Sequence, residues 1–227
     1  MTRLGLLAAV LAGCTQDVDP AWQLDHDRVI AVRTTPSRIA AGESAQLDAL
    51  LGHKGAPPDQ VEPATAEVIS PTSLASALSH GAHWTVTTPG DDRLAAARSE
   101  LALDAGAPVP LRLRVTFAGT DLTGLKVVWL GQHADNPILD PVTIDNMNAL
   151  AEPQLSVPAG VDVPLVVDFD DSYDINWLTS CGTMHDFDLA QAHLHVGPDD
   201  PQSGTLALVV RDSLGGVAWR QWPVAAR

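Results

Sequence analysis

The sequence is short of positive charge. Lysine and arginine together number 13, against 28 aspartate and glutamate residues, which gives a formal net charge of -15 at pH 7. A surface with this excess of negative charge repels nucleic acids and anionic lipid headgroups, which argues against a nucleic-acid partner. The same excess favours cations, either diffusely or at particular sites.

Cysteine is also scarce, and long apolar runs are missing. The chain has two cysteines, Cys14 and Cys181, and no later stretch approaches the roughly 20 apolar residues that a transmembrane helix needs. Hydrophobic residues still make up 45% of the chain, which is far from a disordered composition. We therefore expect packed cores to hold the fold, and the length allows about two small domains.

The N-terminal residues differ in character from the rest. Arg3 is followed by a short apolar run over 4–10, then by Leu-Ala-Gly-Cys at 11–14, and then by polar residues. The apolar run is too short to span a bilayer, which favours a targeting segment. The pattern resembles the signal peptide and lipobox of bacterial lipoproteins.

That resemblance implies removal of residues 1–13, lipid on the new first residue Cys14, and a tether over 14–21. The lipid chains anchor such a protein in a membrane of the cell envelope, because each buried methylene adds about 0.8 kcal/mol. Thr15, where an aspartate would specify retention in the inner membrane, implies the outer membrane. With Cys14 lipidated, Cys181 has no partner for an intramolecular disulfide. An ordinary secretory signal, or a cytoplasmic chain with an apolar start, is the alternative.

From residue 22 onward, short apolar runs alternate with Gly, Pro, Asp and Ser, which predicts an all-β fold. A similar block recurs about 118 residues later, because Ala41-Gly42 and Ala159-Gly160 each precede an apolar strand. Each block closes with an alternating strand, a glycine turn and a second strand, the pattern of a β-hairpin. We therefore predict two tandem β-sandwich domains. The first covers 22–135, the second covers 143–227, and a linker over 136–142 joins them.

The proline-glycine entry, the inner tryptophan Trp177 and the closing hairpin resemble immunoglobulin-like domains of the fibronectin type III or PKD kind. This resemblance implies a fold class and little chemistry. In the first domain, Asp91 and Asp92 precede an alanine-rich stretch to residue 101, which predicts a short helix with acid at its amino end. The segment 67–80 is predicted to be mostly loop, with one weak strand.

The tryptophans are assigned by their strand positions. Trp129, Trp177 and Trp219 are predicted to be core residues, and Trp22 to pack at the start of the first domain. Trp222 follows Trp219 by three residues, so the two point to opposite faces of a strand. We expect one of these two to pack between the domains, and the alternative is an exposed tryptophan that serves as a binding anchor for a sugar or a partner.

The stretch 168–176 concentrates oxygen side chains and is a candidate calcium site, since Ca²⁺ takes six to eight oxygen ligands. It is not an EF-hand loop, because Tyr173 stands where the glycine of the sharp turn belongs. The alternative is a solvated turn between two strands. The candidate ligands are Asp168, Asp170, Asp171, Asp174 and Asn176.

A second candidate metal site comprises Cys181, His185, His193 and His195, because thiol and imidazole are preferred ligands of zinc and copper. His193 and His195 are two residues apart and would project from the same face of a strand. The alternative is a buried Cys181 beside Trp177, with these two histidines facing solvent. A thiol-dependent enzyme using Cys181 and His185 is a further possibility, although Gly-x-Ser-x-Gly, Ser-x-x-Lys and His-Glu-x-x-His are all missing.

These features favour a non-catalytic lipoprotein of the cell envelope, held in the membrane through Cys14. Its two sandwiches would display loops and strand edges to an envelope protein or a polysaccharide, as a binding module, a scaffold or an accessory subunit. No cofactor is required. A calcium- or other cation-binding module is the first alternative, and the thiol-dependent enzyme is the second.

Overall fold

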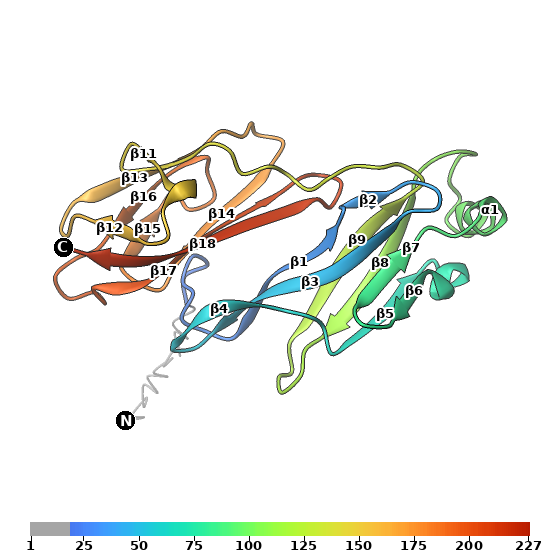
Figure 1. Cartoon of the computed structure of the whole chain (residues 1–227), viewed down its shortest axis with the longest axis horizontal. Helices are drawn as coiled ribbons and strands as arrows, with labels where there is room; N and C mark the ends of the chain where they lie inside the picture. The colour runs from blue at the N-terminus through green and yellow to red at the C-terminus, as the bar shows by residue number, and fades with distance from the viewer. Residues whose placement is uncertain (1–18) are drawn as a thin grey trace, which may run out of the picture.

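Figure 1 shows two lobes, each built from two facing β-sheets. The computed structural model describes residues 19–227, so the predicted signal peptide and Cys14 lie outside the described residues. The fold is all-β with one short α-helix in the first half, which confirms the predicted class. Among the described residues, no helix has the length and apolar character needed to cross a bilayer.

The first lobe is a sandwich of two sheets. One sheet has the strand order β1-β3-β7-β6, with β4 paired to β3, and the other has the order β2-β9-β8-β5. The helices η1 (Thr72–Ala77) and α1 (Asp91–Glu100) lie beside them. The strands are β1 (Arg28–Thr35), β2 (Arg38–Ile39), β3 (Ser44–His53), β4 (Ala56–Val61), β5 (Thr65–Ser70), β6 (Leu78–His80), β7 (Trp84–Thr87), β8 (Val109–Thr116) and β9 (Thr123–Leu130).

The second lobe repeats this plan. One sheet has the order β11-β10-β13-β16-β15, and the facing sheet has the order β12-β18-β17-β14. The helix η2 (Ala149–Ala151) follows β11. The strands are β10 (Val142–Ile144), β11 (Met147–Asn148), β12 (Leu155–Val157), β13 (Asp162–Val167), β14 (Asp174–Thr179), β15 (Thr183–His185), β16 (Gln191–His195), β17 (Ser203–Arg211) and β18 (Val217–Ala226).

The repeat seen in the sequence is present in the structure. In each lobe a short strand runs parallel to the last strand, β2 beside β9 and β12 beside β18. A turn follows with a glycine at positive φ, Gly42 at 79° and Gly160 at 74°, a conformation in which a side chain is disfavoured. Each lobe ends in an antiparallel hairpin, β8–β9 and β17–β18.

Alternating side chains build a separate apolar core in each lobe. In β8, the odd-numbered positions from Val109 to Val115 are buried, and the even-numbered positions are exposed or half-buried. The second core is centred on Trp177 and Trp222, both fully buried. Helix α1 begins with Asp91 and Asp92 and buries Leu94, so the helix predicted from acid at its amino end is present.

Three predictions made from the sequence were wrong. Segment 67–80 is mostly regular, because it contains most of β5, all of η1, and β6. Trp129 and Trp219 are half-buried and are not members of either lobe's core. Trp22 packs against the core of the second lobe, although the sequence placed it at the start of the first.

Candidate functional site

The two lobes meet through an apolar cluster that is distinct from both cores. It joins the outer faces of β1 and β3 in the first lobe to those of β14, β17 and β18 in the second. Trp219 packs against this cluster, as expected for one of the two tryptophans of β18, while Trp222 lies in the core. The buried members are Leu24, Ile30, Ala31, Leu50, Leu178, Ala207, Val209 and Val217.

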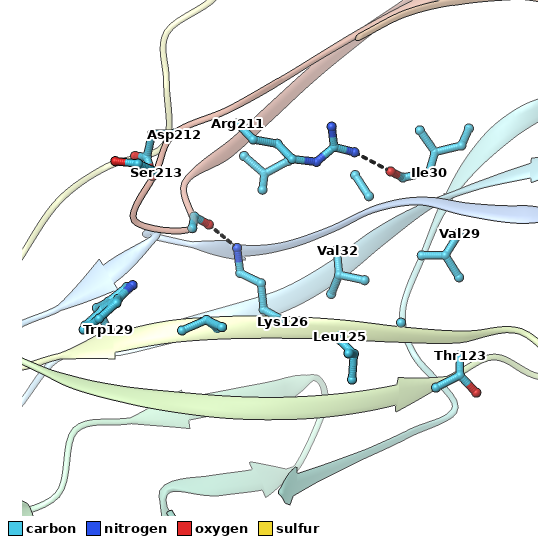
Figure 2. A pocket seen from close by; sticks show the side chains of 15 residues that line it. Val29, Ile30, Val32, Thr123, Leu125, Lys126, Trp129, Arg211, Asp212 and Ser213 are labelled. Atoms are coloured by element: carbon cyan, nitrogen blue, oxygen red, sulfur yellow. Dashed lines mark hydrogen bonds between the residues drawn. The ribbon is translucent and has the colours of Figure 1, made fainter. Parts of the chain in front are cut away.

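The tip of the β17–β18 hairpin docks on β1 and β9 through polar contacts (Figure 2). The Arg211 guanidinium donates to the carbonyl oxygen of Ile30 at 2.7 Å. Arg38 forms an ion pair with Asp212 at 3.0 Å. The other carboxylate oxygen of Asp212 accepts from the backbone N–H of Gly216 at 2.7 Å, so the same residue orders the turn and pairs across the junction.

Asn136 bridges the two lobes with its side-chain amide. Its nitrogen donates to the carbonyl oxygen of Thr34 at 2.9 Å, and its oxygen accepts from the backbone N–H of Val217 at 2.9 Å. Nearby, the guanidinium of Arg33 lies 3.7 Å from the ring centroid of Trp219, a cation–π contact, and also pairs with Asp48 at 2.6 Å. The segment between β9 and β10 is therefore tied to both lobes.

Lys126 occupies an unusual position in β9. The strand buries its even-numbered positions, and at Lys126 only 5% of the residue is exposed. The ammonium group points toward the hairpin and donates to the carbonyl oxygen of Gly215 (Figure 2). Burial lowers the pKa of Lys126 from 10.5 to about 8, because the charged form loses its hydration.

A cleft of about 680 Å³ opens where the hairpin meets the first lobe. Arg211 comes to it from the hairpin, Lys126 from β9, and Val29 and Val32 from β1, while the exposed Leu125 points the other way from β9 at the edge of the cleft (Figure 2). Burial also lowers the pKa of Arg211. The cleft thus combines an apolar wall with two cationic groups at a domain interface, a common location for ligand sites.

The acidic stretch 168–176 forms the connection between β13 and β14. Asp170 accepts from the hydroxyl of Ser172 and from the backbone N–H of Ser172, the latter at 2.8 Å, and these two hydrogen bonds lower the pKa of Asp170. Asp174 accepts from Asn176 at 2.9 Å and lies 3.5 Å from Arg211. Asp168 and Asp171 are exposed. Across residues 19–227, no three His, Cys, Asp or Glu side chains gather closely enough to hold a metal ion.

The structure separates Cys181 from the three histidines. Cys181 lies in the second core, and burial raises the pKa of its thiol, which disfavours the thiolate. His193 and His195 alternate on β16 with the buried residues Ala192 and Leu194, so they lie on the outer face of that sheet. His185 of β15 is paired with His193 and is exposed. His195 pairs with Asp162 at 2.8 Å.

The roles of Lys126, Arg211 and Asn136 at the junction were not predicted from the sequence. The sequence did contain a sign that Lys126 is buried. In the alternating strand 123–130, Lys126 lies on the same face as Val128 and Leu130, and that face points into the core. Arg211 and Asn136 carry no such signal. Their roles depend on how the two lobes are oriented, which no local pattern specifies.

No protein-family model matches the chain, and no curated protein sequence matches it significantly. Among solved structures, the tandem Ig repeats of Dlar align over 87% of this chain and 97% of that chain, at 10% identity and a TM-score of 0.31. The N-terminal Ig1-2 module of the Drosophila receptor protein tyrosine phosphatase DLAR aligns over 88% and 98%, at 9% identity and a TM-score of 0.32.

A nucleoside hydrolase-related hypothetical protein from Saccharophagus degradans, described as associated with carbohydrate metabolism, aligns over 41% of this chain at 17% identity and a TM-score of 0.32. The chain spans only 26% of that protein's length. The chain shows only a distant likeness to these tandem immunoglobulin-like structures, and the description of two β-sandwiches rests on its own four sheets. Likeness of this degree concerns the fold alone.

Proposed function

We propose that this protein is a non-catalytic lipoprotein of the bacterial cell envelope, anchored in the outer membrane through Cys14. Its two interlocked sandwiches serve as a binding module or scaffold that presents loops and strand edges to an envelope protein or a polysaccharide. The observation that carries the proposal is the sequence of residues 1–15, with its basic start, short apolar run and Leu-Ala-Gly-Cys tetrapeptide at 11–14.

The attachment of the N-terminal segment supports this arrangement. The backbone of Leu24 donates to Thr179 at the end of β14, and Thr179 donates to the carbonyl oxygen of Trp22. The segment before β1 thus enters at the junction between the lobes. Figure 1 shows it as the dark blue loop near β17 and β4. An extended tether over 14–21 reaches at most about 28 Å. A lipid at Cys14 would hold the junction within that distance of the membrane.

Two cysteines make the anchor straightforward to test. We would feed the cells that produce the protein with an alkyne-tagged palmitate and compare the wild type with Cys14→Ser and with the matched control Cys181→Ser. We expect label and membrane association in the wild type and in Cys181→Ser, and neither in Cys14→Ser. Label that survives in Cys14→Ser, or a wild-type protein without label in the soluble fraction, would contradict the proposal.

A further inference from the structure

Positive charge gathers at the junction between the lobes, although the protein as a whole is strongly acidic, and two of the cationic residues, Lys126 and Arg211, line the cleft. Of the 13 lysine and arginine residues, five lie around the junction. Three of them contact a carboxylate, in the pairs Arg33–Asp48, Arg38–Asp212 and Arg211–Asp174. The remaining two are Arg28 and Lys126.

Within the described part of the chain, neither Arg28 nor Lys126 has a carboxylate in contact. Two guanidinium nitrogens of Arg28, Nε and Nη2, are buried and have no hydrogen-bond partner there. Repulsion from Arg211 adds to burial in lowering the pKa of Arg28. Since uncompensated buried charge is costly, this region holds more positive charge than the protein itself balances.

The two cationic groups that line the cleft have N–H donors that are not used in hydrogen bonds to the protein. The ammonium of Lys126 has three N–H donors, and its hydrogen bond to Gly215 uses one of them. The guanidinium of Arg211 has five, of which one donates to Ile30 and another faces Asp174. Docking of the hairpin therefore does not exhaust the capacity of either side chain to bind an anion.

The remaining wall of the cleft is apolar. Val29 and Val32 of β1 line it, and Leu125, which is 70% exposed, and Val127 of β9 lie at the edge of the cleft. Asp212 lies on the same lining as the cations and would repel an anion of high charge. These features match a ligand with a single negative charge and an apolar tail better than they match a phosphate.

We propose that the junction cleft binds an organic carboxylate, with its carboxylate at Lys126 and Arg211 and its apolar part along Val29 and Val32. A bound carboxylate would place a negative charge beside Lys126, which has no carboxylate in contact within the described residues. It also contacts both lobes at once, so binding strengthens the contact between them. This inference is independent of the lipid anchor and of the proposed partner.

Hexanoate is a suitable probe, because it carries one carboxylate on a short apolar chain. We would titrate it into the full chain carrying Cys14→Ser, which needs no detergent, and follow backbone amide shifts by NMR. Saturable shifts are expected at Val127, Ser213 and Gly215. Hexanamide has the same tail without the charge and inorganic phosphate has charge without a tail, so both are expected to bind at least tenfold more weakly.

Variants at the edge of the cleft complete the test. Leu125→Asp places a negative charge beside the cleft at an exposed position, and we expect it to weaken hexanoate binding at least tenfold. Leu189→Asp, at another exposed leucine in the second lobe, is the matched control and should bind as the wild type does. Lys126→Met should also weaken binding at least tenfold.

Several results would overturn the inference. These are shifts that do not localise to the cleft, equal binding of hexanamide or phosphate, or unchanged hexanoate affinity in Leu125→Asp. The wild-type titration and the Leu125→Asp variant decide the matter even if Lys126→Met does not fold, since neither changes a buried residue.

Discussion

Replacement of Lys126 by methionine should stabilise the protein at neutral pH and destabilise it at alkaline pH. The variant keeps an unbranched side chain of similar length in the same buried position but removes the ammonium group. Because the folded protein lowers the pKa of Lys126 from 10.5 to about 8, the folded state binds this proton less tightly than the unfolded chain does. The pH dependence of stability follows from this difference.

The sign and size of the effect can be worked out. Above pH 10.5 the lysine is neutral in both states, and no electrostatic cost arises. As the pH falls from 10.5 to 8, the unfolded chain takes up the proton first, and the folded state becomes less stable by about 3 kcal/mol, at about 1.4 kcal/mol per pKa unit. Below pH 8 both states are protonated, and the cost stays constant.

Methionine removes this cost but also removes the hydrogen bond to Gly215, which is worth about 1–2 kcal/mol. The variant should therefore be more stable than the wild type by about 1–2 kcal/mol at pH 7, and less stable by about 1 kcal/mol near pH 10.5. Neighbouring charges contribute in both directions, because Asp212 and Asp48 raise the pKa of Lys126, whereas Arg211 and Arg33 lower it.

Urea denaturation of both proteins at pH 7, 8, 9 and 10.5 measures the difference in the free energy of unfolding. Comparison at each pH cancels the titration of all other groups. Lys54→Met removes a lysine at an exposed position and is the matched control for the substitution itself. A difference between Lys126→Met and the wild type that stays constant across this range would refute the argument, since it would mean that the folded state does not perturb this ammonium.

Three further predictions concern packing. Gly182→Ala should lower the free energy of unfolding by about 3 kcal/mol or more, because φ is +76° and the new Cβ would lie 2.2 Å from a backbone oxygen of β16. Gly42→Ala, at φ +79° in open space, should lower it by only about 1 kcal/mol. Thermal melts of both variants test this contrast. Trp222→Ala should lower the free energy of unfolding by about 3–5 kcal/mol, because it leaves a cavity in the second core. Trp219→Ala should lower it by about 2 kcal/mol, because it removes packing and a cation–π contact at the junction. Equal losses in urea denaturation would contradict the assignment of Trp222 to a core and of Trp219 to the junction. In a Cys14→Ser background, Cys181 should react with a thiol reagent only as fast as the protein unfolds, and fast reaction in native buffer would show that the thiol is accessible.

The sequence predicted the architecture because the relevant signals are local. Strand alternation, the paired glycine turns at Gly42 and Gly160 and the closing hairpins depend on neighbouring residues, and all three appear in the structure. The spacing of Trp219 and Trp222 was likewise sufficient to predict opposite faces, and of the two alternatives for the outward tryptophan the structure shows interdomain packing.

The junction was not predictable in the same way. Asn136 lay in a segment interpreted as a linker. Its side-chain amide nevertheless forms hydrogen bonds with the backbones of Thr34 and Val217, which are separated by most of the chain. Trp22 was assigned to the first lobe because it follows the tether, whereas contacts with β14 place it on the second. Cys181 and the histidines are close in sequence but lie on opposite sides of a sheet layer. Such relations depend on tertiary packing, which a sequence pattern does not encode directly.

The most direct test of the account is the intact mass of the protein purified from its native membranes. We expect a mature chain that begins at Cys14 and carries the mass of a diacylglycerol and an additional acyl chain, with Cys181 unmodified. A chain that still begins with Met1 and carries no acyl mass would contradict the assignment of this protein as a lipid-anchored component of the cell envelope.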